Sequence, residues 1–238
     1  MKTEDLKIRE IPVDMFTPGR KHKVRFGVIH FVSCKNMEGY KNDPYNIEGI
    51  IKLFTELGAE YKFSVHDFIG REGEIINFVN IKDTAWAVGK SVAAFPDYIV
   101  GLNPYSYSVE LAGMTGKPYT SKQYETLGAL TTLRELQIEE QGLGLIENYI
   151  GHDWVSGEIA VKLGIREPGS KKVDPGKFDW QMFHRERMRV QLMQDVMSDC
   201  KEEFRTNLLD EMSSKIKSSM SIGECLSLGF SKLLKRGK

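Results

Sequence analysis

The chain has 238 residues, of which 41% are hydrophobic and 28% are charged, an ordinary composition for a protein that buries a sizeable core. Lysine plus arginine and aspartate plus glutamate both number 33, so the net charge is zero and bulk electrostatics gives no support for a nucleic-acid partner. The three cysteines, Cys34, Cys200 and Cys225, are odd in number and far apart, which is not the pattern of a disulfide framework and predicts reduced thiols.

The first 16 residues carry both charges and contain no apolar core segment, so we expect no secretory signal and synthesis in the cytoplasm. No apolar run approaches the roughly 20 residues of a membrane-spanning helix, and we therefore expect no transmembrane segment. A substrate outside the cytoplasm would then require another protein to release the chain to it.

The N-terminal part of the chain predicts a buried strand followed by a helix. After an irregular lead-in over 1–22, residues 23–32 become increasingly apolar, as in a central strand. A helix is predicted to open at Asp43, which precedes a proline, and to stop at Gly58. Its apolar face comprises Ile47, Ile50, Ile51, Phe54 and Leu57.

Four further strands are predicted in the middle of the chain. Residues 62–69 and 74–80 flank a Gly-Arg-Glu-Gly break and predict a hairpin. Residues 98–102 and 107–111 predict two short strands that an Asn-Pro pair separates.

A second helix is predicted to begin at Thr120, because Gln123 three residues later completes a capping-box pattern. Its apolar stripe comprises Tyr124, Leu127, Leu130, Leu133 and Leu136. Residues 151–180 are rich in glycine, proline and charge and predict a long loop. Strands and helices mixed in this order indicate an α/β fold with a mixed central sheet flanked by helices.

The composition changes near residue 184, because 184–218 contains no glycine or proline. Apolar residues at spacings of three and four predict a long amphipathic helix there, roughly 50 Å if unbroken. We therefore predict two domains, 1–183 and a helical extension, 184–238. The extension is expected to pack on the domain or on a partner chain; a wall- or membrane-targeting tail with a basic end, or a tether to a larger assembly, are the alternatives.

Three residues far apart in the sequence offer metal-ligating groups. His30 lies in the apolar strand, His152 follows a glycine, and Asp174 precedes a Pro-Gly pair. Neutral imidazole and carboxylate are good zinc ligands, and three protein ligands leave a fourth position for water. Spacing alone is weak evidence, because a strand histidine is more often a hydrogen-bonded core residue than a ligand.

Six short segments in one order strengthen the metal hypothesis. They are Gly-Val-Ile-His-Phe at 27–31, Ser-Val-His-Asp-Phe-Ile at 64–69 with Arg-Glu-Gly at 71–73, Ala-Trp-Ala-Val-Gly-Lys-Ser at 85–91, Asn103 through Ser-Val-Glu-Leu at 108–111, Pro-Tyr-Thr at 118–120, and Gly-His-Asp at 151–153 with Lys-Val-Asp-Pro-Gly and Phe-Asp-Trp within 172–180. In this order they resemble the zinc N-acetylmuramoyl-L-alanine amidases. That family includes amidase-type phage lysins, cell-wall recycling amidases and peptidoglycan-recognition proteins.

The resemblance implies the family's mixed sheet, a Zn²⁺ cofactor and a peptidoglycan or muropeptide substrate. By position, His30, His152 and Asp174 match the zinc ligands. Glu110 matches the acidic catalytic residue, a general base for water and proton donor to the leaving amine. Lys172 matches a basic residue that stabilises the oxyanion. Without the resemblance, Glu110 would be an exposed strand carboxylate and Lys172 a solvated loop charge.

Three other residues are candidates for substrate binding. Trp86 offers a stacking surface for a sugar or peptide, and a place in the core is an equal alternative. Asn103 offers an amide to a peptide carbonyl, or shapes the turn before its proline. His66 matches a family histidine outside the ligand set and is expected either to line the cleft or to be structural.

The sequence departs from the family pattern in several places. An insertion over 155–170 separates the last two ligands and is expected to form a surface excursion above the cleft. Ala87 replaces a usual histidine, and Tyr107 and Ser108 replace the usual Ile-Gly. Cys34, four residues after His30, would lie on the same strand face but about 13 Å away, which predicts a buried structural thiol.

The function expected from these features is zinc-dependent hydrolysis of the amide between N-acetylmuramic acid and L-alanine. A phage-type endolysin that reaches the wall after release is the preferred setting. A cytosolic amidase that recycles soluble muropeptides, a non-catalytic peptidoglycan-binding module and a structural virion component are the alternatives.

Overall fold

The computed structural model describes the backbone of residues 3–93 and 98–216, and the side chains of 3–93, 98–196, 206 and 207. The chain divides into two compact units, Met1–Met188 and Arg189–Lys238. The predicted domain boundary after residue 183 stays a prediction. Among the described residues, no helix combines the length and the apolar character needed to cross a membrane.

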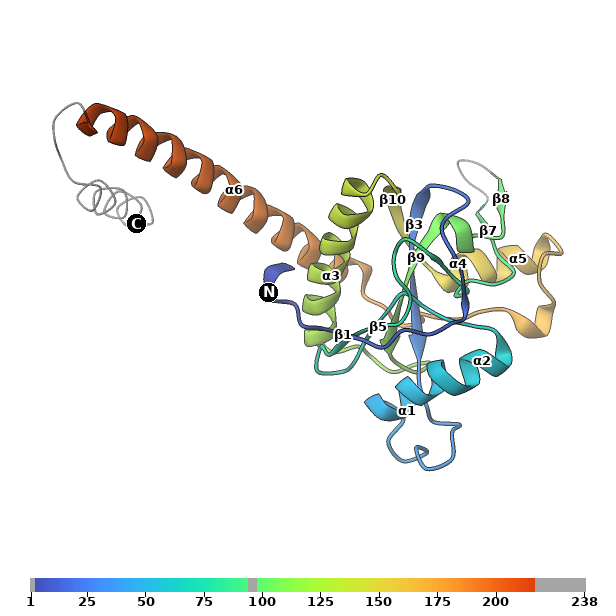
Figure 1. Ribbon diagram of the computed structural model, residues 1–238. Helices are drawn as coiled ribbons and strands as arrows, with labels where there is room; N and C mark the ends of the chain where they lie inside the picture. The colour runs from blue at the N-terminus through green and yellow to red at the C-terminus, as the bar shows by residue number, and fades with distance from the viewer. Residues whose placement is uncertain (1–2, 94–97, 217–238) are drawn as a thin grey trace. The chain divides into compact units, whose positions relative to one another are not determined.

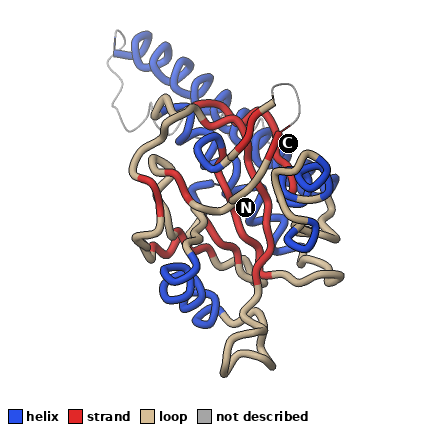
Figure 2. Tube along the Cα trace, turned by 90° about the vertical axis from the view of Figure 1, so that its right-hand side faces the viewer, coloured by secondary structure: helices blue, strands red, loops and turns tan. Residues whose placement is uncertain are grey.

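The first unit is built on one six-stranded mixed sheet, which confirms the predicted fold class (Figures 1 and 2). In spatial order the strands are β1 (Ile8–Glu10), β5 (Ile75–Asn77), β4 (Asp67–Ile69), β9 (Ser106–Ala112), β3 (Val24–Val32) and β10 (Gly144–Gly151). The four strands from β4 to β10 are parallel, and β5 pairs antiparallel with β4 through the predicted hairpin. The central pair, β3 and β9, is almost wholly buried, as parallel strands covered on both faces require.

Among the residues that the structure describes, two small sheets lie outside this one. They pair β2 (Phe16–Thr17) with β6 (Thr84–Ala85), and β7 (Val92–Ala93) with β8 (Ile99–Val100). The second pair brings the 88–93 segment and the residues before β9 together, which matters for the site described below.

Alternation along the strands separates two faces of the sheet. Ile29 on β3 and Val109 on β9 belong to the apolar cluster that includes Leu127 and Leu130 of α3 (Ser121–Glu140). Because successive strand side chains point to opposite faces, His30 points to the face away from α3. Figure 2 shows helices on both sides of the strands.

Helix α3 confirms its predicted start, since Thr120 and Gln123 form a complete capping box. The helix is tied to the sheet by a buried ion pair. Arg134 donates two hydrogen bonds to Asp67 on β4, at 2.8 and 2.7 Å, and the Tyr107 hydroxyl donates a third at 2.7 Å. Arg134 and Asp67 are both buried, so their charges are neutralised by each other rather than by water.

The predicted stop of the first helix at Gly58 is wrong. Helix α1 (Ile47–Lys52) continues through a π-helical turn (Leu53–Leu57) into α2 (Gly58–Tyr61) and ends where Lys62 adopts a left-handed conformation, with φ of 57°. Gly58 itself is helical, and a Cβ there would lie 2.9 Å from the Phe63 carbonyl oxygen. The glycine therefore allows close packing instead of ending the helix.

The predicted loop over 151–180 is wrong in part. It contains α4 (His152–Ser156), α5 (Glu158–Lys162) and a 3₁₀ turn (Pro168–Ser170). Strand β10, which precedes them, was not predicted. The short helices bury Val155 and Ala160, so tertiary packing stabilises elements too short to show a clear periodicity in the sequence.

The predicted C-terminal helix is confirmed as α6 (Trp180–Ile216), which begins four residues earlier than expected. Its first turn belongs to the first unit, where Phe183 is fully buried. The part of the predicted apolar stripe after residue 196, which includes Cys200, falls wholly on side chains outside the described set. Cys225 and the basic end over 232–238 also lie outside the described residues.

Candidate metal centre

Three side chains from three separate segments meet on the sheet face opposite α3. His30 comes from β3, His152 is the first residue of α4, and Asp174 comes from the loop that precedes α6. One potential ligand atom from each lies within 4.8 Å of the others. All three are buried, with exposed fractions of 1%, 3% and 8%. The structure therefore brings together the three residues predicted to hold zinc.

Two of these contacts have the length of a hydrogen bond, but the groups do not carry enough hydrogens for every contact to be one. His30 Nδ1 lies 3.0 Å from His152 Nδ1 and 3.4 Å from Asp174 Oδ2, and His152 Nδ1 lies 3.0 Å from the same oxygen. His152 Nε2 faces the Val88 carbonyl oxygen at 3.1 Å and must donate to it, which leaves a lone pair on Nδ1 of the neutral ring. Two facing acceptors and at most one donor suit a shared cation, and tetrahedral zinc separates its N and O ligands by about 3.3 Å.

The environment favours the protonation states that a metal needs. Burial, and next the neighbouring His152, lower the pKa of His30 to about 4, so its imidazole is neutral at physiological pH. Burial alone would raise the pKa of Asp174, but the close approach of His152 and His30 outweighs it and holds that pKa well below its usual range. A neutral His30 imidazole beside an ionised Asp174 carboxylate is the result.

Backbone contacts join the two ligand segments that lie outside the sheet. The Asp153 N–H donates to the Asp174 carbonyl oxygen at 2.7 Å, and the Lys172 N–H donates to the Ser156 carbonyl oxygen at 3.0 Å. Gly151 permits this approach, because a Cβ there would lie 2.8 Å from Pro175 Cδ. The glycine before His152 is thus explained by close packing against the Asp174 loop.

Two tyrosines of the α3 region hold the far side of the Asp174 loop. The Tyr119 hydroxyl donates to the Pro175 carbonyl oxygen at 2.7 Å, and the Tyr124 hydroxyl accepts from the Asp179 N–H at 2.7 Å. Phe178 packs against both rings. Tyr119 and Tyr124 had no predicted role at the site, although the first belongs to a recognised motif.

Glu110 lies beside the three ligands. It pairs with His30 in the register of β9 and β3, so both side chains point to the same face. Its Oε2 is buried without a hydrogen-bond partner among the described residues. Burial, and next the charge of Asp174, raise its pKa well above the usual range, while Lys172 opposes the shift. A carboxyl with a raised pKa and a partnerless buried oxygen suits acid–base chemistry.

Lys172 is exposed and lies two residues before Asp174. Its ammonium charge acts on both His30 and Glu110, which places it in the electrostatic surroundings of the site. Its predicted role at the oxyanion stays a prediction.

The three predicted substrate-binding residues lie in different environments. His66 is fully buried: its Nδ1 accepts from the Ser108 N–H at 3.1 Å, and its Nε2 contacts the Asp83 carbonyl oxygen and Arg20. This burial contradicts a contact between His66 and substrate and supports the structural alternative. Its burial and the Arg20 charge lower its pKa well below the usual range, so the ring is a neutral core group.

Trp86 packs with the apolar cluster of Phe54 and Val65, and its Nε1 donates to Thr17 Oγ1 at 2.9 Å. It lines a cavity of about 370 Å³ that contains none of the three ligands. Asn103 uses its side-chain oxygen to accept from the Val88 N–H at 2.8 Å. Trp86 therefore serves as a partly buried core residue, and Asn103 contacts the backbone that faces His152.

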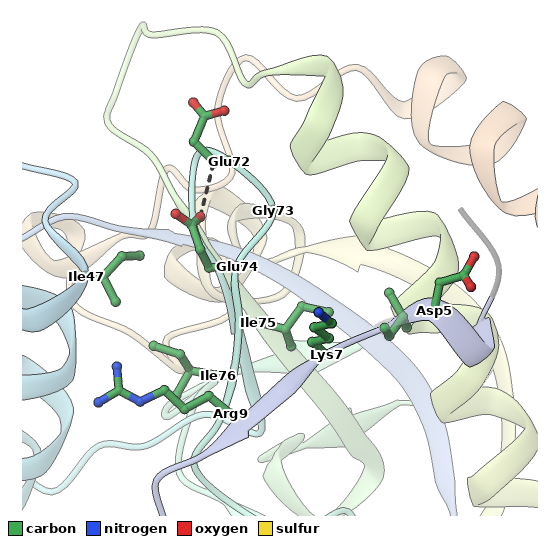
Figure 3. Close-up of a pocket in the computed structure, with 10 residues that line it drawn as sticks. Asp5, Lys7, Arg9, Ile47, Glu72, Gly73, Glu74, Ile75 and Ile76 are labelled. Carbon is green, nitrogen blue, oxygen red and sulfur yellow. Dashed lines mark hydrogen bonds between the residues drawn. The ribbon is translucent and has the colours of Figure 1, made fainter.

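The last residue considered from the sequence is Cys34, the alternative metal ligand. Cys34 is buried, with Sγ near the carbonyl oxygens of Asp43 and Pro44 at 3.5 and 3.3 Å, which agrees with a structural thiol. A separate pocket of about 440 Å³ lies at the β1–β5 edge (Figure 3). Its floor includes Ile75 and Ile76, and none of the predicted site residues lines it.

A mixed α/β sheet with a buried His-His-Asp cluster and an adjacent glutamate whose Oε2 is buried is the arrangement that a metal-dependent hydrolase uses. Residues 20–177 match the family model described as N-acetylmuramoyl-L-alanine amidase. The chain belongs to the N-acetylmuramoyl-L-alanine amidase family, a family of enzymes. The matched region includes the three candidate zinc ligands, Glu110 and Lys172.

Curated relatives support the same family. The 1,6-anhydro-N-acetylmuramyl-L-alanine amidase AmpD of Enterobacter cloacae is 30% identical over 133 residues, which are 56% of this chain and 60% of that protein. The AmpD protein of Haemophilus influenzae is 27% identical over 164 residues, covering 66% and 78% respectively. The match thus spans less than two thirds of the Enterobacter protein.

Solved structures support the fold. A crystal structure of a selenomethionine AmpD derivative superposes with a TM-score of 0.58 at 24% identity, covering 78% of this chain and 97% of that chain. The Staphylococcus aureus hydrolase AmiA gives a TM-score of 0.51 at 16% identity, covering 80% and 86%. At these identities the likeness shows a shared architecture.

Proposed function

We propose that this chain hydrolyses the amide between N-acetylmuramic acid and L-alanine, with a zinc ion held by His30, His152 and Asp174. The observation that carries the proposal is the convergence of three buried ligand atoms that hydrogen bonding cannot satisfy. When bound, the zinc ion supplies Lewis acidity that activates water and polarises a carbonyl.

Glu110 is the residue proposed to move protons. Its partnerless Oε2 on the same sheet face as His30 can take a proton from the attacking water and deliver it to the leaving nitrogen. Its raised pKa favours the protonated form that the second step needs. The neighbouring ammonium of Lys172 is proposed to stabilise the negative charge that develops on the carbonyl oxygen.

A soluble 1,6-anhydro-muropeptide is the proposed substrate. The relatives carry that substrate in their descriptions, which supports the recycling alternative better than the phage endolysin preferred from the sequence. Turnover of a soluble substrate fits the expected cytoplasmic synthesis, and release to the cell wall is then unnecessary. The complete donor set with Glu110 favours catalysis over the non-catalytic binding module.

The test compares two substrates with one enzyme preparation. Zinc-loaded protein is incubated with a soluble anhydro-N-acetylmuramyl peptide and, separately, with purified sacculi, and products are identified by mass spectrometry. We expect free peptide beginning with L-alanine from the soluble substrate, little release from sacculi, and no product after chelation. Efficient clearing of sacculi with slow turnover of the soluble peptide would restore the endolysin hypothesis, and no cleavage of either would reject the amidase assignment.

A further inference from the structure

The backbone of Val88 lies directly behind the candidate ligand His152, and the two peptide groups that flank its Cα make one contact each. The Val88 carbonyl oxygen accepts from His152 Nε2 at 3.1 Å, and the Val88 N–H donates to Asn103 Oδ1 at 2.8 Å. We propose that Asn103 is a positioning residue of the metal centre, because it holds the backbone of Val88, whose carbonyl oxygen fixes the orientation and tautomer of His152. This inference rests on the zinc site of the proposed function.

The tautomer decides whether His152 can bind a metal at this place. A hydrogen on Nε2, donated to Val88, leaves the Nδ1 lone pair directed at Asp174 and His30. A ring free to rotate or to change tautomer would present a hydrogen there for part of the time. Partners behind a ligating histidine change metal affinity by about 10–100-fold when they are removed.

The segment that carries Val88 is fixed from a second side. Ser156 Oγ lies 3.2 Å from the Val88 carbonyl oxygen and donates to the Lys90 carbonyl oxygen at 3.0 Å. Arg166, from the insertion, donates to the same Lys90 oxygen at 3.1 Å. Val88 and Ser156 are buried, so water cannot replace these contacts. Asn103 is the partner that fixes the Val88 N–H, which belongs to the peptide group before the one that faces His152.

This arrangement gives Asn103 a role different from direct substrate contact. Its side-chain oxygen is engaged by backbone within the protein, and the three-residue turn it begins (Asn103–Tyr105) leads into β9 and Glu110. A substrate-binding asparagine would affect KM and leave zinc affinity unchanged. A positioning asparagine acts on zinc affinity in the absence of substrate.

The experiment measures zinc affinity and the His152 tautomer in the substrate-free protein. Asn103→Ala removes the acceptor, and Asn103→Asp keeps an oxygen in its place. Asn80→Ala is the matched control, because Asn80 Oδ1 accepts a comparable backbone hydrogen bond from Lys82 at 3.0 Å away from the ligands. Zinc dissociation constants come from competition with a chromophoric chelator, and long-range ¹H–¹⁵N NMR of the metal-free protein reports which His152 nitrogen carries the hydrogen.

We expect Asn103→Ala to weaken zinc binding by about 10–100-fold, with Asn103→Asp and Asn80→Ala close to wild type. In metal-free wild type, His152 should carry its hydrogen on Nε2, and Asn103→Ala should shift part of the population to Nδ1. Wild-type zinc affinity in Asn103→Ala with a raised KM would overturn the proposal in favour of substrate binding.

Two safeguards keep the outcome decisive. If Asn103→Ala does not fold, an Nδ1–H tautomer in the metal-free wild type alone would overturn the proposal, and an Nε2–H tautomer together with weakened zinc binding in Ser156→Ala would support it. If wild type binds no zinc, the proposed function fails, and the loss of the Nε2–H tautomer in Asn103→Ala still decides whether Asn103 positions His152.

Discussion

The two sides of the candidate metal centre are held in place by different means. His30 lies in β3, between β9 and β10, and its position follows from the hydrogen-bond ladders of the sheet. His152 is the first residue of α4 and Asp174 lies in a loop, and the contacts that hold them include those to Val88 and, through Pro175, to Tyr119. His30 Nε2 has no hydrogen-bond partner among the described residues, whereas His152 Nε2 has one.

Because the two sides are held differently, we expect substitutions on them to change different quantities: the free energy of unfolding on the sheet side, and the zinc dissociation constant on the loop side. A change on the sheet side must disturb the whole sheet before it moves a ligand, so it should act first on the free energy of unfolding. A change on the loop side can move one ligand while the sheet stays intact, so it should act first on the zinc dissociation constant. The predictions below test this separation.

The largest effect is expected at Asp174. Asp174→Ala removes the only carboxylate of the donor set and leaves two neutral imidazoles, so we expect no stoichiometric zinc after dialysis and no activity. Metal content by mass spectrometry checks this. Asp153→Asn, beside His152 but outside the donor set, is the matched control and should retain zinc; retention by Asp174→Ala as well would show that the metal binds elsewhere.

Glu110→Gln tests the sheet-side residue that is not a ligand. The amide keeps the size of the side chain but cannot take up or deliver the proton, so kcat should fall by about 10²–10⁴-fold. Zinc content should stay at the wild-type level, because Glu110 is outside the donor set. Full activity in this variant would show that another group moves the proton.

Arg134→Met should act on stability alone. It leaves Asp67 buried without its cation, which is expected to lower the free energy of unfolding of the metal-free protein by about 3–5 kcal/mol. Urea titration measures this, and zinc affinity of the folded protein should be unchanged. Arg9→Met breaks the exposed pair with Glu48 and should have little effect on stability. A large loss of zinc affinity in folded Arg134→Met would contradict the separation.

The smallest effect is expected for Tyr119→Phe, which changes the loop side of the site and should act on zinc affinity. It removes the hydroxyl that donates to Pro175 and is expected to weaken zinc binding by up to about 10-fold. Tyr107→Phe removes a hydroxyl from the sheet side and should lower stability by about 1 kcal/mol with unchanged zinc affinity. If the two variants changed the zinc dissociation constant equally, the sheet side and the loop side of the site would depend on the same contacts.

The sequence predicts well those elements whose signal is local. The buried strand of His30, the hairpin at Gly70 and the capping box of Thr120 all depend on neighbouring residues, and the structure contains them. Strand β10 and helices α4 and α5 are missed because they are short and depend on contacts with distant segments.

The residues of the site also differ in how far the sequence predicts them. His30, His152 and Asp174 are predicted from a resemblance across six segments, since their separation in the chain carries little information. The contacts behind them use backbone carbonyls of Val88 and Pro175, and every residue type has such a carbonyl. The positioning role of Asn103 and the anchoring role of Tyr119 therefore emerge only from the geometry.

X-ray absorption at the zinc edge tests the central claim most directly. The account predicts one zinc ion per chain, bound by two imidazole nitrogens and by oxygen at about 2.0–2.2 Å, with no sulfur neighbour. A sulfur shell near 2.3 Å, or an unchanged spectrum in His30→Ala, would show that these three side chains do not hold the metal.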